Sequence, residues 1–230
     1  MTERPGASIW LRPERAAVGR PAQRSRAEIT AVAIEIADRE GLDAVSMRRV
    51  AADLGTGAAS LYRYVDNREE LLDLMTDAVG GEYQLAEPSG DWLADLLAVG
   101  EQARVILRRH PWLPGLVVTR PPSMGPNGVA LLEHVLAALE PHPANIAAKM
   151  EAFAMLNGLT VAFVLNELAG GSAAQRRIVA YLARVIASGE RPRLARLLSQ
   201  PPAVDATAPD PADRYPDIMS RVLTGLLGPA

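Results

Sequence analysis

The stretch that decides the fold runs from Ser46 to Tyr64 and reads SMRRVAADLGTGAASLYRY. Ser46 can cap a helix with an apolar inner face, Gly55 ends that helix, and Thr56 can cap a second one. Two short helices joined at a glycine turn have the geometry of a helix-turn-helix. The second helix of such a unit can enter the major groove of DNA. The stretch therefore predicts a DNA-binding unit.

The outward side chains of that second helix fit this interpretation. They are a hydroxyl, two phenols and a guanidinium, from Ser60, Tyr62, Tyr64 and Arg63. Hydroxyl and phenol groups can bind phosphates, and arginine can bridge guanine O6 and N7. The alternative is an ordinary helical hairpin with a polar surface, which would more usually carry Glu and Lys.

Helix signals continue on both sides of the stretch. Ser25 and Glu28 form a capping box before an apolar face with helical spacing, and Gly41 ends that helix as a left-handed cap. The run DNRE at 66–69 resembles another cap and opens a helix through Val79. Residues 25–80 therefore read as four short helices.

The rest of the chain also predicts only helices. Gly80-Gly81 and the run EPSG at 87–90 indicate a junction between two domains. The helices expected beyond it cover about 91–109, 113–119, 127–140, 144–169, 173–188, 191–199 and 214–227. We therefore expect an all-α protein divided into a basic flexible arm at 1–24, a helix-turn-helix domain at 25–80 and a larger ligand-binding and dimerisation domain at 81–230.

Composition excludes several classes of protein. The 230 residues include no cysteine, which excludes disulfides, thiolate zinc sites and a cysteine nucleophile. The net charge is −3, yet residues 1–26 carry six arginines against two glutamates. Such charge asymmetry favours a nucleic-acid contact by the arm, although a solvated tail is the alternative. The three histidines lack metal-ligand spacing, so we expect no metal, no cofactor and no enzyme.

One helix predicts both location and assembly. The uncharged apolar stretch from Ala152 to Leu165 is too short to span a bilayer, and no secretion signal is evident, so we expect a cytoplasmic protein without a membrane partner. The helix at 144–169 is apolar nearly all round and needs two covering surfaces. Together with the apolar face Ile218, Val222 and Leu226 of the last helix, it predicts a homodimer.

The helix-turn-helix region resembles the tetracycline-repressor (TetR) family. The resemblance covers about residues 25–80 and rests on GL at 41–42, SMR at 46–48, LG at 54–55 and LYRYV at 61–65. It implies operator DNA as the partner and places DNA contacts at Arg48, Ser60, Tyr62, Arg63, Tyr64 and Arg68, with Arg48 and Arg68 on phosphates. Ala58 and Ala59 stand where relatives often carry larger base-reading groups.

The C-terminal part resembles the ligand-binding domain of the tetracycline-repressor subgroup through HPW at 110–112, TRP at 119–121 and GPN at 125–127. Leu116 stands where that subgroup's naming member has a magnesium-binding histidine, so a metal–tetracycline chelate is disfavoured. The candidate residues for an unidentified small-molecule inducer are Trp112, Thr119, Met124, His134, Phe153 and Asn157. His134 could instead be a core histidine, and Asn157 could bridge helices.

The function predicted from these features is sequence-specific repression relieved by ligand. A ligand that prefers a dimer with splayed DNA-binding units would shift the population away from the spacing that operator DNA needs. Two alternatives remain at this stage. One is a helical carrier or enzyme that uses the C-terminal pocket, and the other is an interaction module with a vestigial DNA surface.

Overall fold

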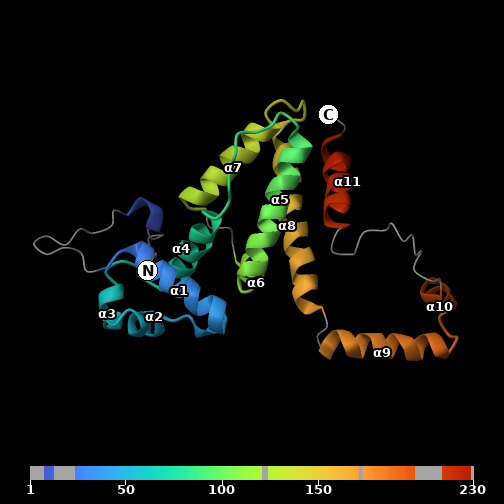
Figure 1. Ribbon diagram of the computed structural model, residues 1–230, viewed down its shortest axis with the longest axis horizontal. Coiled ribbons are helices and arrows are strands. Elements are labelled where there is room, and N and C mark those ends of the chain that lie inside the picture. Colours follow the sequence, from blue (N-terminus) through green and yellow to red (C-terminus); the bar gives the residue numbers. More distant parts are fainter. Residues whose placement is uncertain (1–7, 13–23, 121–123, 171–172, 200–213, 229–230) are drawn as a thin grey trace, which may run out of the picture.

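The computed structural model describes residues 8–12, 24–120, 124–170, 173–199 and 214–228, and within them every regular element is helical. The all-α prediction is therefore confirmed (Figure 1). The elements are η1 (Ile9–Leu11), α1 (Arg26–Glu40), η2 (Leu42–Ala44), α2 (Met47–Asp53), α3 (Ala58–Leu61), α4 (Arg68–Gly80), α5 (Trp92–Arg109), α6 (Leu113–Thr119), α7 (Pro126–Leu139), α8 (Ile146–Ala169), α9 (Ala173–Ala187), α10 (Pro192–Ser199) and α11 (Tyr215–Leu227).

Helices α1 to α4 form a small unit that we call the head. Its helices begin where the sequence placed caps: the Ser25–Glu28 capping box is present, and the side chains of Ser46 and Asn67 accept backbone N–H groups of α2 and α4. Leu61, Leu71 and other apolar side chains of the head are completely buried. These side chains belong to one buried apolar cluster that continues into α5, α6 and α8 through residues such as Ile106 and Leu113.

Two turn residues differ from prediction. Gly41 has a positive φ of 86°, but its ψ of 164° lies outside the left-handed helical region. Gly57, not Thr56, is the N-cap residue of α3, and no side chain caps that helix. The Thr56 hydroxyl instead lies 2.8 Å from the Ser60 hydroxyl.

Residues 8–12, which we call the strap, pack against the head instead of extending as a free arm. Ile9 is 3% exposed and belongs to the head's core. Arg12 forms ion pairs with Asp66 and Glu70, and the Arg26 guanidinium donates to the carbonyls of Ile9 and Arg12. Sequence reasoning missed this because one isolated Ile-Trp-Leu cannot show helical periodicity.

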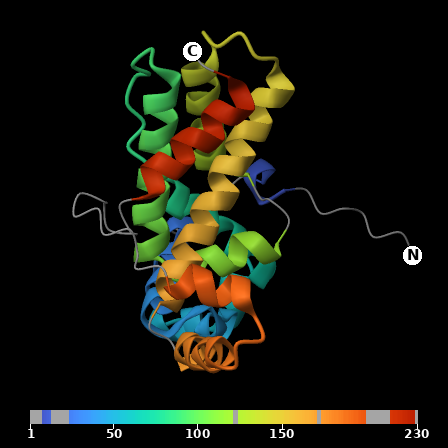
Figure 2. The same ribbon diagram turned by 90° about the vertical axis from the view of Figure 1, so that its right-hand side faces the viewer.

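Helices α5, α8 and α11 lie side by side and form, with α6 and α7, the unit that we call the body (Figure 2). Tyr215 of α11 is fully buried between them, and its hydroxyl lies 2.6 Å from that of Thr160 on α8. Gly100 of α5 makes room for it, since a Cβ there would lie 2.3 Å from the Tyr215 oxygen. These contacts fix α11 against the body.

Helices α9 and α10 project from the body, as Figure 1 shows. Their apolar side chains Ile178, Val179, Tyr181 and Leu197 are each more than half exposed. Helix α8 is, by length and composition alone, apolar enough to cross a membrane. It packs against α5 and α11, as expected of a core helix in a folded bundle.

Candidate DNA interface and ligand pocket

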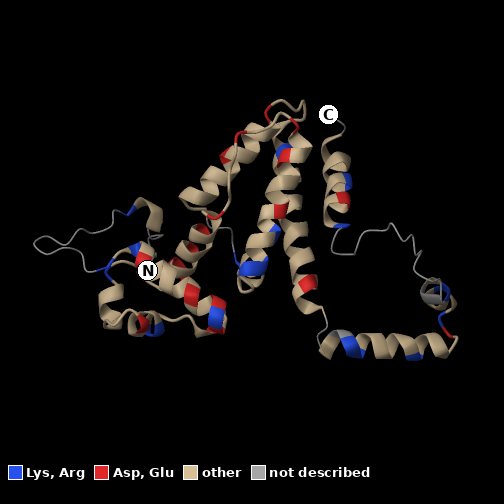
Figure 3. Ribbon diagram, in the orientation of Figure 1, with Lys and Arg blue, Asp and Glu red and all other residues tan. Residues whose placement is uncertain are grey.

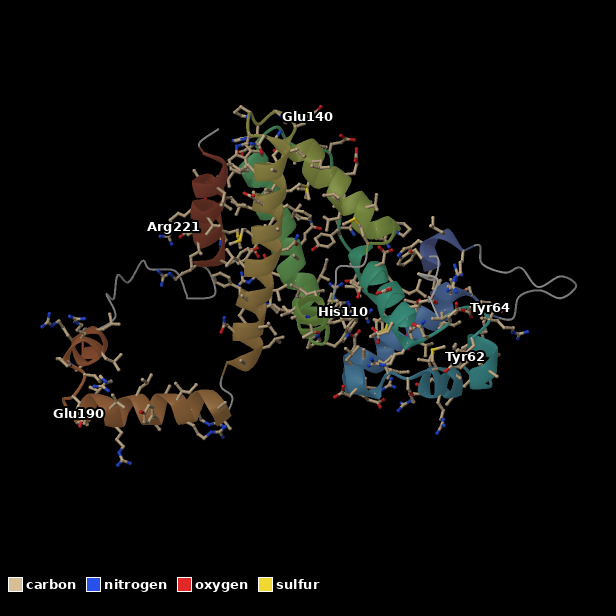
Figure 4. All side chains as sticks on the ribbon, turned by 180° about the vertical axis from the view of Figure 1, so that it is seen from behind. Tyr62, Tyr64, His110, Glu140, Glu190 and Arg221 are labelled. Atoms are coloured by element: carbon tan, nitrogen blue, oxygen red, sulfur yellow. The ribbon has the colours of Figure 1, made fainter. Side chains whose placement is uncertain are left out.

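The helix-turn-helix presents a polar surface built by α2, α3 and the turn after α3. Arg48, Tyr62 and Arg68 share one groove, which Ser46, Met47, Asp66 and Asn67 complete. A neighbouring groove is lined by Ser60, Arg63, Tyr64, Arg24, Gly55 and Thr56. Figure 4 shows Tyr62 and Tyr64 on this part of the head. The six residues expected at DNA therefore fall into two adjacent groups.

The members of these groups differ in what they can offer to DNA. Arg48, Tyr62 and Arg63 are exposed, and Tyr62 retains 51% of its accessible surface. Ser60 donates to the carbonyl of Gly57 at 2.6 Å, so its hydroxyl is already engaged within the turn. Arg68 donates to the carbonyls of Val45 and Leu42 at 3.0 and 3.1 Å. The geometry thus gives Arg68 a buttressing contact within the head beside any phosphate contact.

The arginines near the N-terminus are partly engaged as well. Arg24 donates to the carbonyl of Leu54 at 2.7 Å, and Arg26 donates to the carbonyl of Tyr64 at 3.1 Å. With Arg12 paired to carboxylates, three of the six arginines brace the head internally. Arg4, Arg15 and Arg20 lie outside the described residues.

A cavity of about 280 Å³ lies between α4 and the body. Its walls come from α4 to α8 and are mainly aliphatic. The lining residues are Thr76, Asp77, Val79, Gly80, Tyr83, Ala103, Ile106, Leu107, Leu113, Val117, Met124, Gly128, Leu131, Phe153, Asn157, Thr160 and Val161. An apolar cavity with a few polar groups is the usual form of a small-molecule site.

The polar side chains that line this cavity are those of Thr76, Asp77, Tyr83, Asn157 and Thr160. The Asp77 carboxylate accepts the backbone N–H groups of Asn127 and Gly128, so it is occupied in holding the start of α7. The Asn157 amide and the Tyr83 hydroxyl have no hydrogen-bond partner among the described residues. Burial raises the pKa of Tyr83 well above its usual value, so the phenol keeps its proton. Both groups can therefore hydrogen-bond a ligand.

The cavity includes three of the six residues expected to bind ligand, namely Met124, Phe153 and Asn157. Trp112, Thr119 and His134 are not among its lining residues. The Trp112 indole N–H donates to Asp38 at 2.7 Å, and the Thr119 hydroxyl donates to the carbonyl of Gly115 at 2.8 Å. Tyr83, which sequence reasoning missed, lies in the segment after α4 that was read as a plain junction.

Helix α4 belongs to both the head and the cavity wall. Its buried residues Leu71 and Leu72 lie in the head's core, whereas Thr76 and Val79 line the cavity. Arg120, at the end of α6, also forms ion pairs with carboxylates of α4. Helix α4 therefore connects the cavity wall with the buried cluster of the head.

A second surface is apolar but lies outside the cavity. The face of α8 that points away from α5 presents Met155, Gly158, Ala162 and Leu165, all exposed. No charged residue occurs on α8 between Glu151 and Glu167 (Figure 3). The neighbouring α11 turns Tyr215, Met219 and Leu223 inward and leaves Leu226 exposed with Ile218 and Val222 half-buried. Two neighbouring helices therefore both carry exposed apolar side chains.

The described ranges contain no group of three or more His, Asp and Glu side chains placed to hold a metal ion. The polar groups of the cavity that remain available to a ligand include the Asn157 amide and the Tyr83 phenol.

Comparisons with known proteins match both units. Residues 29–75 match the model of the tetR family of bacterial regulatory proteins, and residues 86–227 match that of the tetracyclin repressor-like C-terminal domain. The HTH-type transcriptional repressor DrrR1 of Streptomyces coeruleorubidus is 36% identical over 210 residues, which cover 86% of this chain and 75% of that one.

Solved structures agree. The crystal structure of apo ActR from Streptomyces coelicolor has a TM-score of 0.74 at 31% identity and covers 90% of this chain and 98% of that one. The crystal structure of ActR in complex with (S)-DNPA has a TM-score of 0.73 at 32% identity and covers 90% of this chain and 98% of that one. The complex of ActR with actinorhodin has a TM-score of 0.72 at 29% identity and covers 90% of this chain and 96% of that one.

Proposed function

The chain belongs to the TetR family of bacterial transcription regulators. We propose that it is a homodimeric repressor. In this proposal it leaves its operator when a small molecule fills the cavity between α4 and the body. DNA-binding regulation of transcription is the activity of the family. The ligand class, the dimer and the residues that act are the parts that we propose.

The observation that carries the proposal is the dual role of α4. One end of this helix packs in the head's core, and its other end lines the cavity with Thr76 and Val79. A ligand that prefers a cavity with displaced walls therefore also prefers a displaced head. Binding of ligand and binding of DNA then oppose each other by the same coupling free energy.

Two heads are needed for a stable grip on an operator. Recognition helices of a dimer must lie about 34–36 Å apart to reach successive turns of the major groove. The apolar surface formed by α8 and α11 is self-complementary in chemistry, and a two-fold axis through it would bury it on both protomers. Exposed small residues such as Gly158 and Ala162 would let two copies of α8 approach closely.

The inducer that the cavity favours is largely apolar, with polar groups that meet Asn157 and Tyr83. ActR binds actinorhodin and (S)-DNPA, and we propose a ligand of comparable character here. The residues proposed to line its site among those expected from sequence are Met124, Phe153 and Asn157.

The proposal includes the division of the chain into an arm at 1–24, a DNA-binding domain at 25–80 and a ligand-binding and dimerisation domain at 81–230. We propose Arg48, Tyr62, Arg63 and Tyr64 as the principal DNA contacts. The relatives are transcriptional regulators, which supports a cytoplasmic protein without catalytic activity.

The test uses the full chain and the DNA that flanks its own gene. We expect salt-dependent binding at one palindromic site by footprinting, weakened when actinorhodin is added. Arg63→Ala should remove protection at the site, while Arg176→Ala, on the projecting α9, serves as a control for loss of positive charge. Binding that is equal for operator and unrelated DNA would refute sequence-specific repression and favour a vestigial DNA surface.

A further inference from the structure

His110 lies at the corner where α5 ends and the chain turns into α6. It is the C-cap residue of α5, and only 4% of its surface is exposed. Figure 4 shows His110 where the lower end of the body meets the head. Buried polar side chains are usually hydrogen-bonded, so both ring nitrogens of His110 are expected to have partners.

Both ring nitrogens of His110 face carboxylates that come from the other side of the joint. Nδ1 lies 2.7 Å from Oδ1 of Asp38, near the end of α1. Nε2 lies 2.9 Å from Oε1 of Glu82, just after α4. The same Asp38 oxygen accepts the Trp112 indole N–H at 2.7 Å, and the second Glu82 oxygen accepts from Arg109 at 2.5 Å.

The hydrogen-bonding chemistry of imidazole and carboxylate determines which charge of the His110 ring fits these two contacts. An ionised carboxylate only accepts hydrogen bonds, and a neutral imidazole has a single N–H to donate. Both short contacts are hydrogen bonds only when the ring carries two protons. With an imidazolium, the facing charges of Asp38, Glu82, Arg109 and His110 balance. Without that proton, one ring nitrogen would face a carboxylate lone pair, and one negative charge would remain uncompensated.

The corner that carries His110 also joins two walls of the cavity. Ile106 and Leu107 line the cavity one turn before His110, and Leu113 lines it three residues after. A ligand pressing on these walls therefore acts on the segment that holds α1. This connection is separate from the one through α4.

We propose that His110 is a positioning residue that, as an imidazolium clamped between Asp38 and Glu82, holds the head in its DNA-binding orientation and makes that orientation dependent on pH. A partly buried ion network adds little net stability, because desolvation offsets its attraction. Its fixed geometry nevertheless selects one arrangement of α1 against the α5–α6 corner. The expected change in operator affinity rests on the proposed function, whereas the expected change in the orientation of the head does not.

The test exploits the absence of cysteine in the chain. Spin labels at Ala52→Cys on α2 and Ala98→Cys on α5, both exposed positions, report the distance between head and body. Labelled protein is diluted with excess unlabelled protein so that distances within one protomer dominate. Operator affinity of the same samples is measured in parallel, with the pH raised in steps from mildly acidic to alkaline values.

In the wild type we expect one narrow distance at low pH and a second, broader population as the pH rises. His110→Gln should show the broad population at every pH, with operator affinity lowered at least about fivefold. His142→Gln is the matched control, because His142 is equally buried but lies at the turn between α7 and α8. This control should behave like the wild type.

Asp38→Asn provides a second variant, should His110→Gln fold poorly, and it should also broaden the distance. A narrow, pH-independent distance in the wild type, or an unchanged distance in His110→Gln, would overturn the clamp. Failure of the wild type to bind the operator at any pH, with the distance responding as expected, would instead refute the proposed function and leave the clamp standing.

Discussion

Replacing Ala103 by leucine tests whether the cavity is open space or filled core. Ala103 is 5% exposed on α5 and lines the cavity. Leucine adds three carbon atoms, and burial of each methylene contributes about 0.8 kcal/mol, so Ala103→Leu should raise the free energy of unfolding by up to about 2 kcal/mol. The added side chain also occupies part of the about 280 Å³ that a ligand needs, so ligand affinity should fall.

The matched control is the same substitution in filled core. Ala138 is 2% exposed on α7 and packs among α5, α8 and α11 side chains, outside the cavity. Overpacking of a filled core costs about 1–3 kcal/mol, so Ala138→Leu should destabilise the protein. Urea unfolding measures the free energy of unfolding of both variants, and calorimetry measures their ligand binding. We expect the free energy of unfolding to rise for Ala103→Leu and to fall for Ala138→Leu. Destabilisation by Ala103→Leu comparable to that of Ala138→Leu, or an unchanged ligand affinity, would refute the cavity as the ligand site.

Four further expectations follow. Arg63→Ala should cost about 1–3 kcal/mol of operator binding at an unchanged melting temperature, whereas Arg68→Ala should lower the melting temperature, because its guanidinium holds two backbone carbonyls of the head. Ile9→Ala should lower the free energy of unfolding in urea by about 2–5 kcal/mol, and no change would contradict packing of the strap. Val222→Asp should give a folded monomer in sedimentation, since Val222 lies on the outer face of α11; an intact dimer would exclude that face. Burial raises the pKa of Tyr215 to about 12, so stability should be full below the ordinary tyrosine value of about 10 and fall as the pH rises above it. Tyr215→Phe should lessen that fall, and an unaltered alkaline profile would argue against the buried phenol.

Sequence predicted the helices of this protein well because their ends carry local chemistry. Ser25, Ser46 and Asn67 each cap a helix as expected, since a capping hydrogen bond involves only neighbouring residues. Thr56 shows that a residue type suited to capping does not always cap a helix. Its hydroxyl lies next to that of Ser60, four residues along the chain.

The sites depend on contacts between distant segments, which periodicity does not report. Arg68, which is predicted to contact phosphate, also reaches backbone carbonyls more than twenty residues before it. Trp112 looked like a pocket aromatic, yet its N–H bonds Asp38, 74 residues earlier. Nothing in the sequence near His110 indicates that both of its ring nitrogens meet carboxylates of distant segments. Asn157 and Phe153 do line the cavity, and their role in binding a ligand stays a prediction.

The most direct test of ligand-relieved repression is the operator dissociation constant measured across a titration of actinorhodin, for the wild type and for Ala103→Leu. We expect the wild type to lose affinity for its operator as the cavity fills, by about 5- to 150-fold at saturation. Ala103→Leu should bind the same operator with little response to the ligand. An operator affinity that stays constant while calorimetry shows the wild-type cavity occupied would contradict the account.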